Sequence, residues 1–145
     1  MNGHVLIAVD GSDPAEQAIE YAAINHSGDR ITVIHVVNPA DNLYGGVEGG
    51  YYSQDLFDQS VERGEKLCAQ ARDRLREAGV SDSTTIETTV EIGRPTQEIV
   101  EYTEENDVDH IVMGSHGRSG VSRLLLGSVA ETVVRRAPVP VTIIR

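Results

Sequence analysis

The sequence alternates between short apolar segments and longer segments with helical patterning, and this alternation limits the folds that the chain can adopt. Residues 5–9 form an unbroken aliphatic run, which is typical of a strand buried on both faces of a parallel sheet. Asp13 followed by Pro14 predicts a capped helix after this strand. Such alternation favours an α/β fold whose parallel, doubly wound sheet carries helices on both faces. The predicted strands are 5–9, 31–37, 84–92, 109–113 and 139–144, and the predicted helices are 14–26, 54–78, 96–106 and 129–136.

The length of 145 residues is that of one domain, which we expect to extend over residues 1–145 around one core. No apolar run approaches the roughly 20 residues that span a bilayer, and the first residues lack the pattern of a signal peptide. We therefore expect a cytoplasmic protein that does not associate with membranes. Cys68 has no second cysteine to pair with and is expected to be a small buried side chain. His35, in the second strand, is expected to be a hydrogen-bonded core residue.

A formal net charge of -11 restricts the partners of this chain. Nucleic-acid binding needs a basic face that neutralises phosphates, and this balance of charges argues against one. The chain has one lysine and eleven arginines beside its 23 carboxylates, a composition that resembles proteins adapted to molar salt. We therefore expect a halophilic protein, with an ordinary acidic surface as the alternative.

A glycine-rich loop joins the fourth predicted strand to the last predicted helix. A phosphate group needs backbone N–H groups that point together, close access to the main chain and a positive field. Gly114, Gly117 and Gly127 meet the first two needs because glycine has no Cβ. Ser128 is predicted to be the N-cap of the last helix, whose dipole adds partial positive charge, and Arg118 adds a full charge. The loop contains neither a Walker A motif nor a G-x-G-x-x-G motif, so the predicted anion site is of another kind.

The spacing Gly114-x2-Gly117-x9-Gly127-Ser128 resembles the G-x2-G-x9-G-[ST] signature of the universal stress protein family, in its ATP-binding branch. The resemblance extends over residues 1–145. It implies an adenine nucleotide alpha hydrolase-like fold, with a five-stranded parallel sheet in the order 3-2-1-4-5. It also implies ATP as the ligand and a homodimer joined through strand 139–144. The family positions that contact ATP match Val36, Met113, Gly114, Gly117, Gly127, Ser128 and Val129.

This strand order would place a crevice where the order reverses direction, between the first and fourth strands. Asp10 follows the first strand and Gly114 follows the fourth, so the topology and the glycine spacing indicate the same place. Asp10 would accept hydrogen bonds from a ribose or hold a Mg²⁺ ion that bridges phosphates. The alternative for Asp10 is structural, because Asp-Gly-Ser readily forms a turn. Ala8 and Val9 would flank the sugar and base, and Val36 would meet the adenine edge through its backbone groups.

Two classes of function remain open for such a site. In the first, ATP is a signal or structural ligand of a stress-response module, and its occupancy alters the loop at 38–53 or a partner surface. In the second, the protein is a slow ATP hydrolase or phosphotransferase that uses the same loop. Phosphoryl transfer needs a positioned base and metal ligands, and only His116 and Asp10 offer a base. Binding without rapid turnover is therefore favoured, and no catalytic residue is assigned. A third interpretation, a receiver-type signalling domain, shares the architecture but would leave the glycine spacing unexplained.

Overall fold

A five-stranded parallel sheet forms the centre of the protein, in a computed structural model that describes residues 3–44, 51–52, 54–115 and 126–145. Its strands are β1 (His4–Ala8), β2 (Arg30–Val37), β5 (Thr85–Ile92), β6 (His110–Gly114) and β7 (Val141–Ile144). They lie in the order β5-β2-β1-β6-β7, and each neighbouring pair is parallel. Counted along the chain, this is the order 3-2-1-4-5, so the predicted α/β fold is confirmed.

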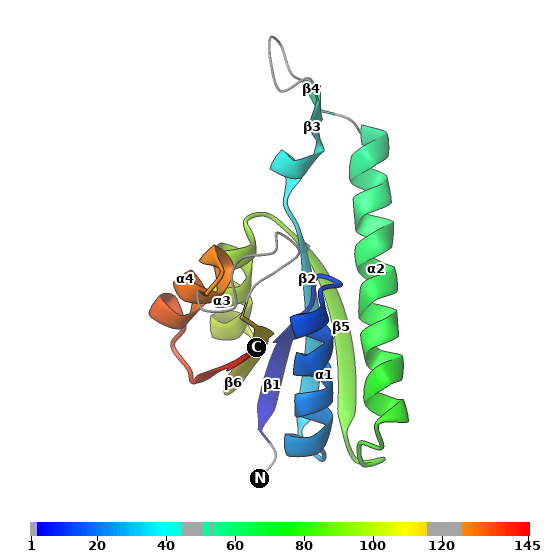
Figure 1. Ribbon diagram of the computed structural model, residues 1–145, viewed down its shortest axis with the longest axis vertical. Coiled ribbons are helices and arrows are strands. Elements are labelled where there is room, and N and C mark those ends of the chain that lie inside the picture. The colour runs from blue at the N-terminus through cyan, green and yellow to red at the C-terminus, as the bar shows by residue number, and fades with distance from the viewer. Residues whose placement is uncertain (1–2, 45–50, 53, 116–125) are drawn as a thin grey trace.

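Helices cover both faces of this sheet (Figure 1). α1 (Asp13–Asn25) and α2 (Gln54–Glu77) pack against one face, and α3 (Pro95–Glu105) and α4 (Ser128–Arg136) lie against the other. Within the part of the chain that the structure describes, no helix combines the length and the apolar character that crossing a membrane requires.

The helices bury two apolar clusters, one on each face of the sheet. Val5 and Ile7 of β1 belong to the cluster under α1 and α2, whereas Leu6 belongs to the cluster under α3 and α4. Successive side chains of a strand point to opposite faces, so β1 needs an apolar residue at each of these positions. Cys68 lies in the first cluster, 2% exposed, as the sequence predicts, and burial raises the pKa of its thiol to about 11.

α1 is capped one residue earlier than the sequence pattern indicates. Ser12 is extended (φ -81°, ψ 161°), and its Oγ accepts a hydrogen bond from the backbone N of Ala15 at 3.3 Å. The prediction of Asp13 as the cap is therefore wrong. Asp13 is the first helical residue instead, where its carboxylate still lies close to the positive end of the helix dipole.

The segment after β2 contains short regular elements, where the sequence predicted only a loop over 38–53. A 3-10 helix, η1 (Pro39–Asn42), precedes the antiparallel strands β3 (Leu43–Tyr44) and β4 (Tyr51–Tyr52). This hairpin stands beyond the carboxyl end of the sheet, above the start of α2 in Figure 1. Its tip lies outside the described residues, so closure of this segment over a ligand stays a prediction.

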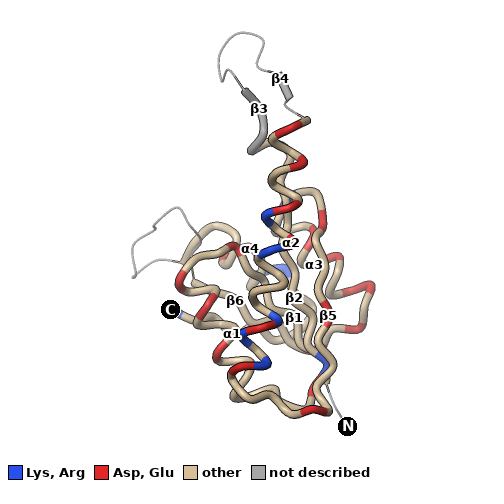
Figure 2. The backbone as a smooth tube through the Cα atoms, turned by 90° about the vertical axis from the view of Figure 1, so that its right-hand side faces the viewer, with Lys and Arg blue, Asp and Glu red and all other residues tan. Residues whose placement is uncertain are grey.

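Figure 2 marks the positions of the charged residues along the backbone, and Asp and Glu predominate over Lys and Arg on the visible face. Arg74 of α2 lies 3.6 Å from Glu16 of α1 and also pairs with Glu20, so these contacts join the two helices. The three side chains are well exposed, and exposed ion pairs contribute little to stability. The halophilic character stays a prediction.

Buried polar side chains at the amino end of the sheet satisfy one another. The Nδ1 of His4 lies 3.0 Å from the carbonyl oxygen of Asn106, and its Nε2 lies 2.7 Å from the Oγ1 of Thr32. A carbonyl only accepts, so Nδ1 donates and the Nε2 of a neutral ring accepts from the Thr32 hydroxyl. This pair of bonds ties β1 to β2 and to the end of α3.

Thr32→Val should lower the free energy of unfolding by about 1–3 kcal/mol, because it leaves the Nε2 of His4 buried without a donor. Urea denaturation followed by circular dichroism measures the change. Thr88→Val is the matched control, since Thr88 is exposed on β5 and should change stability by less than about 0.5 kcal/mol. Equal losses in the two variants would contradict the role given to this hydrogen bond.

Candidate functional site

A cavity of about 220 Å³ opens at the carboxyl ends of β1, β2 and β6. The chain leaves β1 through α1 towards β2 on one side, and β6 lies on the other side of β1. The cavity therefore lies at the point where the strand order reverses, which is where open α/β sheets bind ligands. Its lining residues are Ala8, Val9, Asp10, Ser12, Ala15, Ile34, His35, Val36, Pro95, Ile99, Met113, Gly114, Gly127, Ser128, Val129 and Ala130.

The structure brings the predicted site residues together around this cavity. Nine of the eleven line it, and they come from β1, β2, β6, α4 and the turns that follow or precede these elements. These nine are Ala8, Val9, Asp10, Val36, Met113, Gly114, Gly127, Ser128 and Val129. The other two, Gly117 and Arg118, lie outside the described residues.

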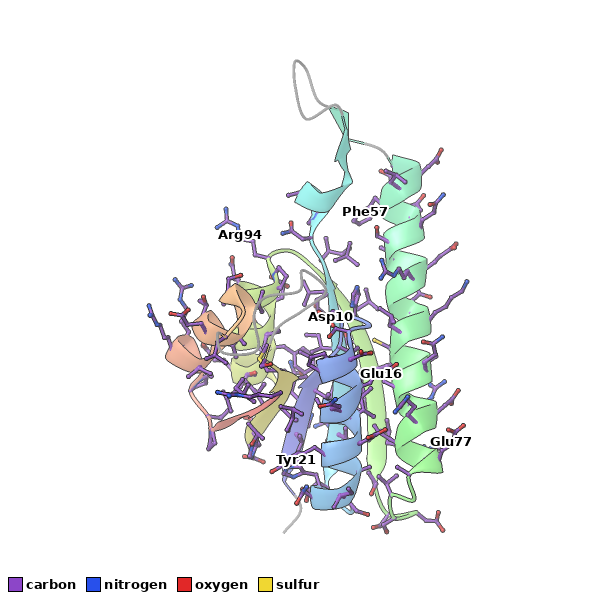
Figure 3. All side chains as sticks on the ribbon, viewed as in Figure 1. Asp10, Glu16, Tyr21, Phe57, Glu77 and Arg94 are labelled. Carbon is purple, nitrogen blue, oxygen red and sulfur yellow. The ribbon has the colours of Figure 1, made fainter. Side chains whose placement is uncertain are left out.

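Asp10 has both a structural contact and a place on the cavity wall. It is the second residue after β1, and it lies beside the start of α1 (Figure 3). Its Oδ1 accepts a hydrogen bond from the backbone N of Ser12 at 3.0 Å, which is the turn that the Asp-Gly-Ser sequence favours. Among the described residues, none bonds to the other carboxylate oxygen. The turn thus occupies one oxygen of Asp10 and leaves the second for a ligand.

The first turn of α4 lines the opposite side of the cavity. Its N-cap is Gly127, in an extended conformation (φ -64°, ψ 159°), and no side chain caps it. The prediction of Ser128 as the N-cap is therefore wrong, because the chain enters the helix one residue earlier. Ser128, Val129 and Ala130 occupy the first helical positions, where backbone N–H groups have no partner within the helix. The site thus combines N–H groups that have no partner within the helix with the positive end of the α4 dipole.

The backbone of Ser115 closes the base of the loop that the glycine motif spans. Its carbonyl oxygen accepts a hydrogen bond from the N of Gly127 at 2.7 Å, and its own N donates to the carbonyl of Ile144 at 2.7 Å. Ser115 is 2% exposed. The entry to α4 is therefore joined to both β6 and β7, a role that the spacing of glycines alone does not reveal.

Gly114 is a glycine because α1 packs directly against it. A Cβ at this position would lie 2.6 Å from the Cβ of Pro14, 2.9 Å from its carbonyl carbon and 3.1 Å from the N of Ala15. Two of these three atoms belong to the backbone of the first turn of α1, which cannot rotate away. The absence of a side chain at the end of β6 thus sets how closely α1 approaches the cavity.

Gly114→Ala should lower the free energy of unfolding by about 1–3 kcal/mol, because the added methyl group forces the first turn of α1 away from β6. Thermal and urea unfolding measure the loss. Gly3→Ala is the control, since its Cβ would lie at an ordinary 3.5 Å from the Oδ2 of Asp109. If Gly114→Ala proves as stable as this control, α1 can shift at no cost and the close packing has no energetic role.

The rest of the wall is largely apolar. Ile34, Val36, Ile99 and Met113 line it from β2, α3 and β6. Within the described ranges, no group of three or more His, Cys, Asp or Glu side chains is placed to hold a metal ion. Such a site suits a ligand with one flat apolar part and one anionic part.

The fold and the cavity define a doubly wound α/β protein with a ligand site at its topological switch point. A family model described as "Universal stress protein family" matches residues 1–145. The chain therefore belongs to the universal stress protein family.

Two relatives match over nearly the whole chain. Universal stress protein MJ0531 of Methanocaldococcus jannaschii is 33% identical over 145 residues, which cover 97% of this chain and 81% of the relative. Universal stress protein YxiE of Bacillus subtilis is 30% identical over 153 residues, which cover 100% of both chains.

Solved structures share the fold over the same length. The structure of hypothetical protein MJ0577 has a TM-score of 0.82 and 26% identity, covering 99% of this chain and 96% of that one. The universal stress protein from Archaeoglobus fulgidus in complex with dAMP has a TM-score of 0.71 and 26% identity, covering 100% and 98%. A universal stress protein in complex with cAMP has a TM-score of 0.68 and 25% identity, covering 99% and 96%.

Proposed function

We propose that this protein binds ATP in the cavity at the carboxyl edge of the sheet and acts as a nucleotide-dependent regulatory module in the stress response. The observation that carries the proposal is the convergence of nine predicted residues on one cavity. They were selected by the glycine spacing, the family resemblance and the switch-point argument. Two universal stress proteins of the same fold were solved with dAMP and with cAMP, which supports an adenine nucleotide as the ligand class.

The chemistry of the wall suggests how the nucleotide lies. The adenine would occupy the apolar part between Val36 and Met113, where burial of its flat faces is favourable. The ribose would lie at Asp10, which has a carboxylate oxygen that no described residue bonds. The phosphates would lie at the first turn of α4, where N–H groups and the helix dipole favour anions. Gly117 and Arg118 would add to this phosphate site.

We propose binding with little or no turnover, in preference to the alternative of a slow ATP hydrolase or phosphotransferase. Rapid phosphoryl transfer requires a positioned base and metal ligands. Along the described cavity wall, Asp10 is the acidic side chain, and it already accepts the Ser12 amide. One carboxylate is enough to hold a Mg²⁺ ion that arrives with the phosphates. It is not enough to hold such an ion and also orient an attacking water.

Calorimetric titration in molar KCl with Mg²⁺ should give clear ATP binding, much weaker GTP binding and no ADP over several hours. Steady release of ADP would favour the hydrolase instead. If folded, ligand-free protein gives no heat with either nucleotide, the proposed function is wrong.

The same titration with Asp10→Asn tests the role of the carboxylate, because the amide keeps an oxygen for the Ser12 N–H and loses the negative charge. We expect it to weaken ATP binding about tenfold with Mg²⁺ present, since an amide is a poorer ligand for the ion. In EDTA the variant and the wild type should bind equally if Asp10 acts only through Mg²⁺, whereas a direct bond from Asp10 to the ribose should leave the variant weaker in EDTA as well. Asp13→Asn is the control, because Asp13 is exposed on α1 and is absent from the cavity wall.

We also propose a homodimer joined through the segment 139–144. β7 lies at the edge of the sheet, where β6 is its only partner among the described strands, and its four residues are half-buried. β7 begins at Val141, so Pro138 and Pro140 precede the strand and leave its free edge open to pairing. Light scattering should give twice the chain mass over a range of concentrations. A monomer mass throughout would contradict the dimer.

A further inference from the structure

His35 makes a side-chain contact that the sequence did not assign to the site. It lies near the carboxyl end of β2, half-buried, and lines the cavity next to Val36. Its Nδ1 lies 2.8 Å from the carbonyl oxygen of Val9, the residue directly after β1. A carbonyl only accepts, so the Nδ1 of His35 carries the proton and donates. The expectation of a hydrogen-bonded histidine is confirmed, and its partner is a backbone group of the cavity wall.

This bond takes the place of the next backbone hydrogen bond between β1 and β2. The N of Val9 donates to the carbonyl of Ile34 at 3.0 Å, as the parallel ladder requires. In a regular parallel ladder, the Val9 carbonyl would then accept from the N–H of Val36, two residues beyond Ile34. The registered pairing of the two strands ends at Ala8 and Ile34, and within the described chain no backbone bond joins Val36 to Val9. The imidazole of His35 occupies the place of that N–H.

The direction of the Val36 backbone follows from the alternation along β2. The carbonyl of Val37 accepts from the N of Gly93, so the polar groups of Val37 point towards the β5 side. Neighbouring residues of a strand direct their backbone groups to opposite sides, and Val36 therefore points towards β1. Because β1 has ended there, the N–H and C=O of Val36 face the space that the cavity occupies.

We propose that His35 is a positioning residue of the base site: by bonding the Val9 carbonyl, its imidazole keeps the Val36 amide free to read a purine edge. The inference rests on the proposed function and deepens it. Adenine presents an unprotonated ring nitrogen and an amino group side by side, which match one N–H donor and one C=O acceptor. Guanine presents a protonated ring nitrogen and a carbonyl oxygen there, so both contacts would be mismatched. Mismatched buried polar groups give strong discrimination between ligands.

A glycine in α2 leaves the space that the His35 imidazole occupies. Gly64 lies inside α2 and is buried, where glycine costs about 0.5–1 kcal/mol relative to alanine. A Cβ at residue 64 would lie 2.6 Å from the Cδ2 of His35. The helix therefore closes on the imidazole with no room for a methyl group, and this contact holds the ring against the end of β1.

The test compares His35→Leu, which removes the donor, with His35→Asn, whose amide nitrogen can replace Nδ1. Calorimetry with ATP and GTP should show about a tenfold loss of ATP affinity and a reduced preference for ATP in His35→Leu. His35→Asn should restore both. Gly64→Ala should also weaken ATP binding, but not in the His35→Asn background, where the shorter side chain leaves room for the methyl group. His110→Asn, at the amino end of the sheet, should bind as the wild type does.

Hydrogen exchange of the Val36 amide, measured by NMR on ligand-free protein, provides a readout that does not depend on the nucleotide. It should be fast in the wild type and in His35→Asn. In His35→Leu it should be slow, because the amide takes over the Val9 carbonyl. Equal exchange rates in wild type and His35→Leu, or an unchanged ATP affinity and preference, overturn the role of His35. If the wild type binds no ATP, the proposed function fails and the exchange rates alone decide the inference.

Discussion

The burial of β1 on both faces and along both edges is the constraint on which the rest of the structure depends. β1 pairs with β2 on one side and with β6 on the other, and its side chains belong to both apolar clusters. A strand in this position has no free edge, so the chain must leave it at its carboxyl end and cross over a face of the sheet. The cavity opens at this carboxyl end, between the neighbouring ends of β2 and β6.

The residues around the cavity serve structure and site at once. Gly114 gives α1 room to approach and also ends β6 at the cavity wall. Asp10 bonds the Ser12 amide through one oxygen and keeps the other uncommitted. Ser115 ties the entry of α4 to β7, so the proposed phosphate site and the proposed dimer edge share one set of backbone bonds. A ligand that orders the first turn of α4 would therefore act on the strand that would border the second subunit in the proposed dimer.

Helix caps and the segment after β2 show where sequence patterns stop being sufficient. Serine and aspartate both cap helices well, and Ser12 and Asp13 are adjacent, so only the direction in which the chain leaves β1 decides between them. At α4, Gly127 takes the cap position, although Ser128 has the better capping side chain. The hairpin of β3 and β4 depends on pairing between residues that a local pattern does not connect.

The sequence by itself determined the order of elements, the identity of the buried strands and nine residues that meet at one cavity. Hydrophobic periodicity and glycine spacing are local properties; the strand order came from the family resemblance, and the switch-point rule then located the cavity between the first and fourth strands. The tertiary structure alone decided that Gly64 admits the His35 ring and that this ring bonds the Val9 carbonyl. These contacts join residues that lie 26 or more positions apart, and their geometry depends on how closely α2 packs on the sheet, which no local pattern encodes.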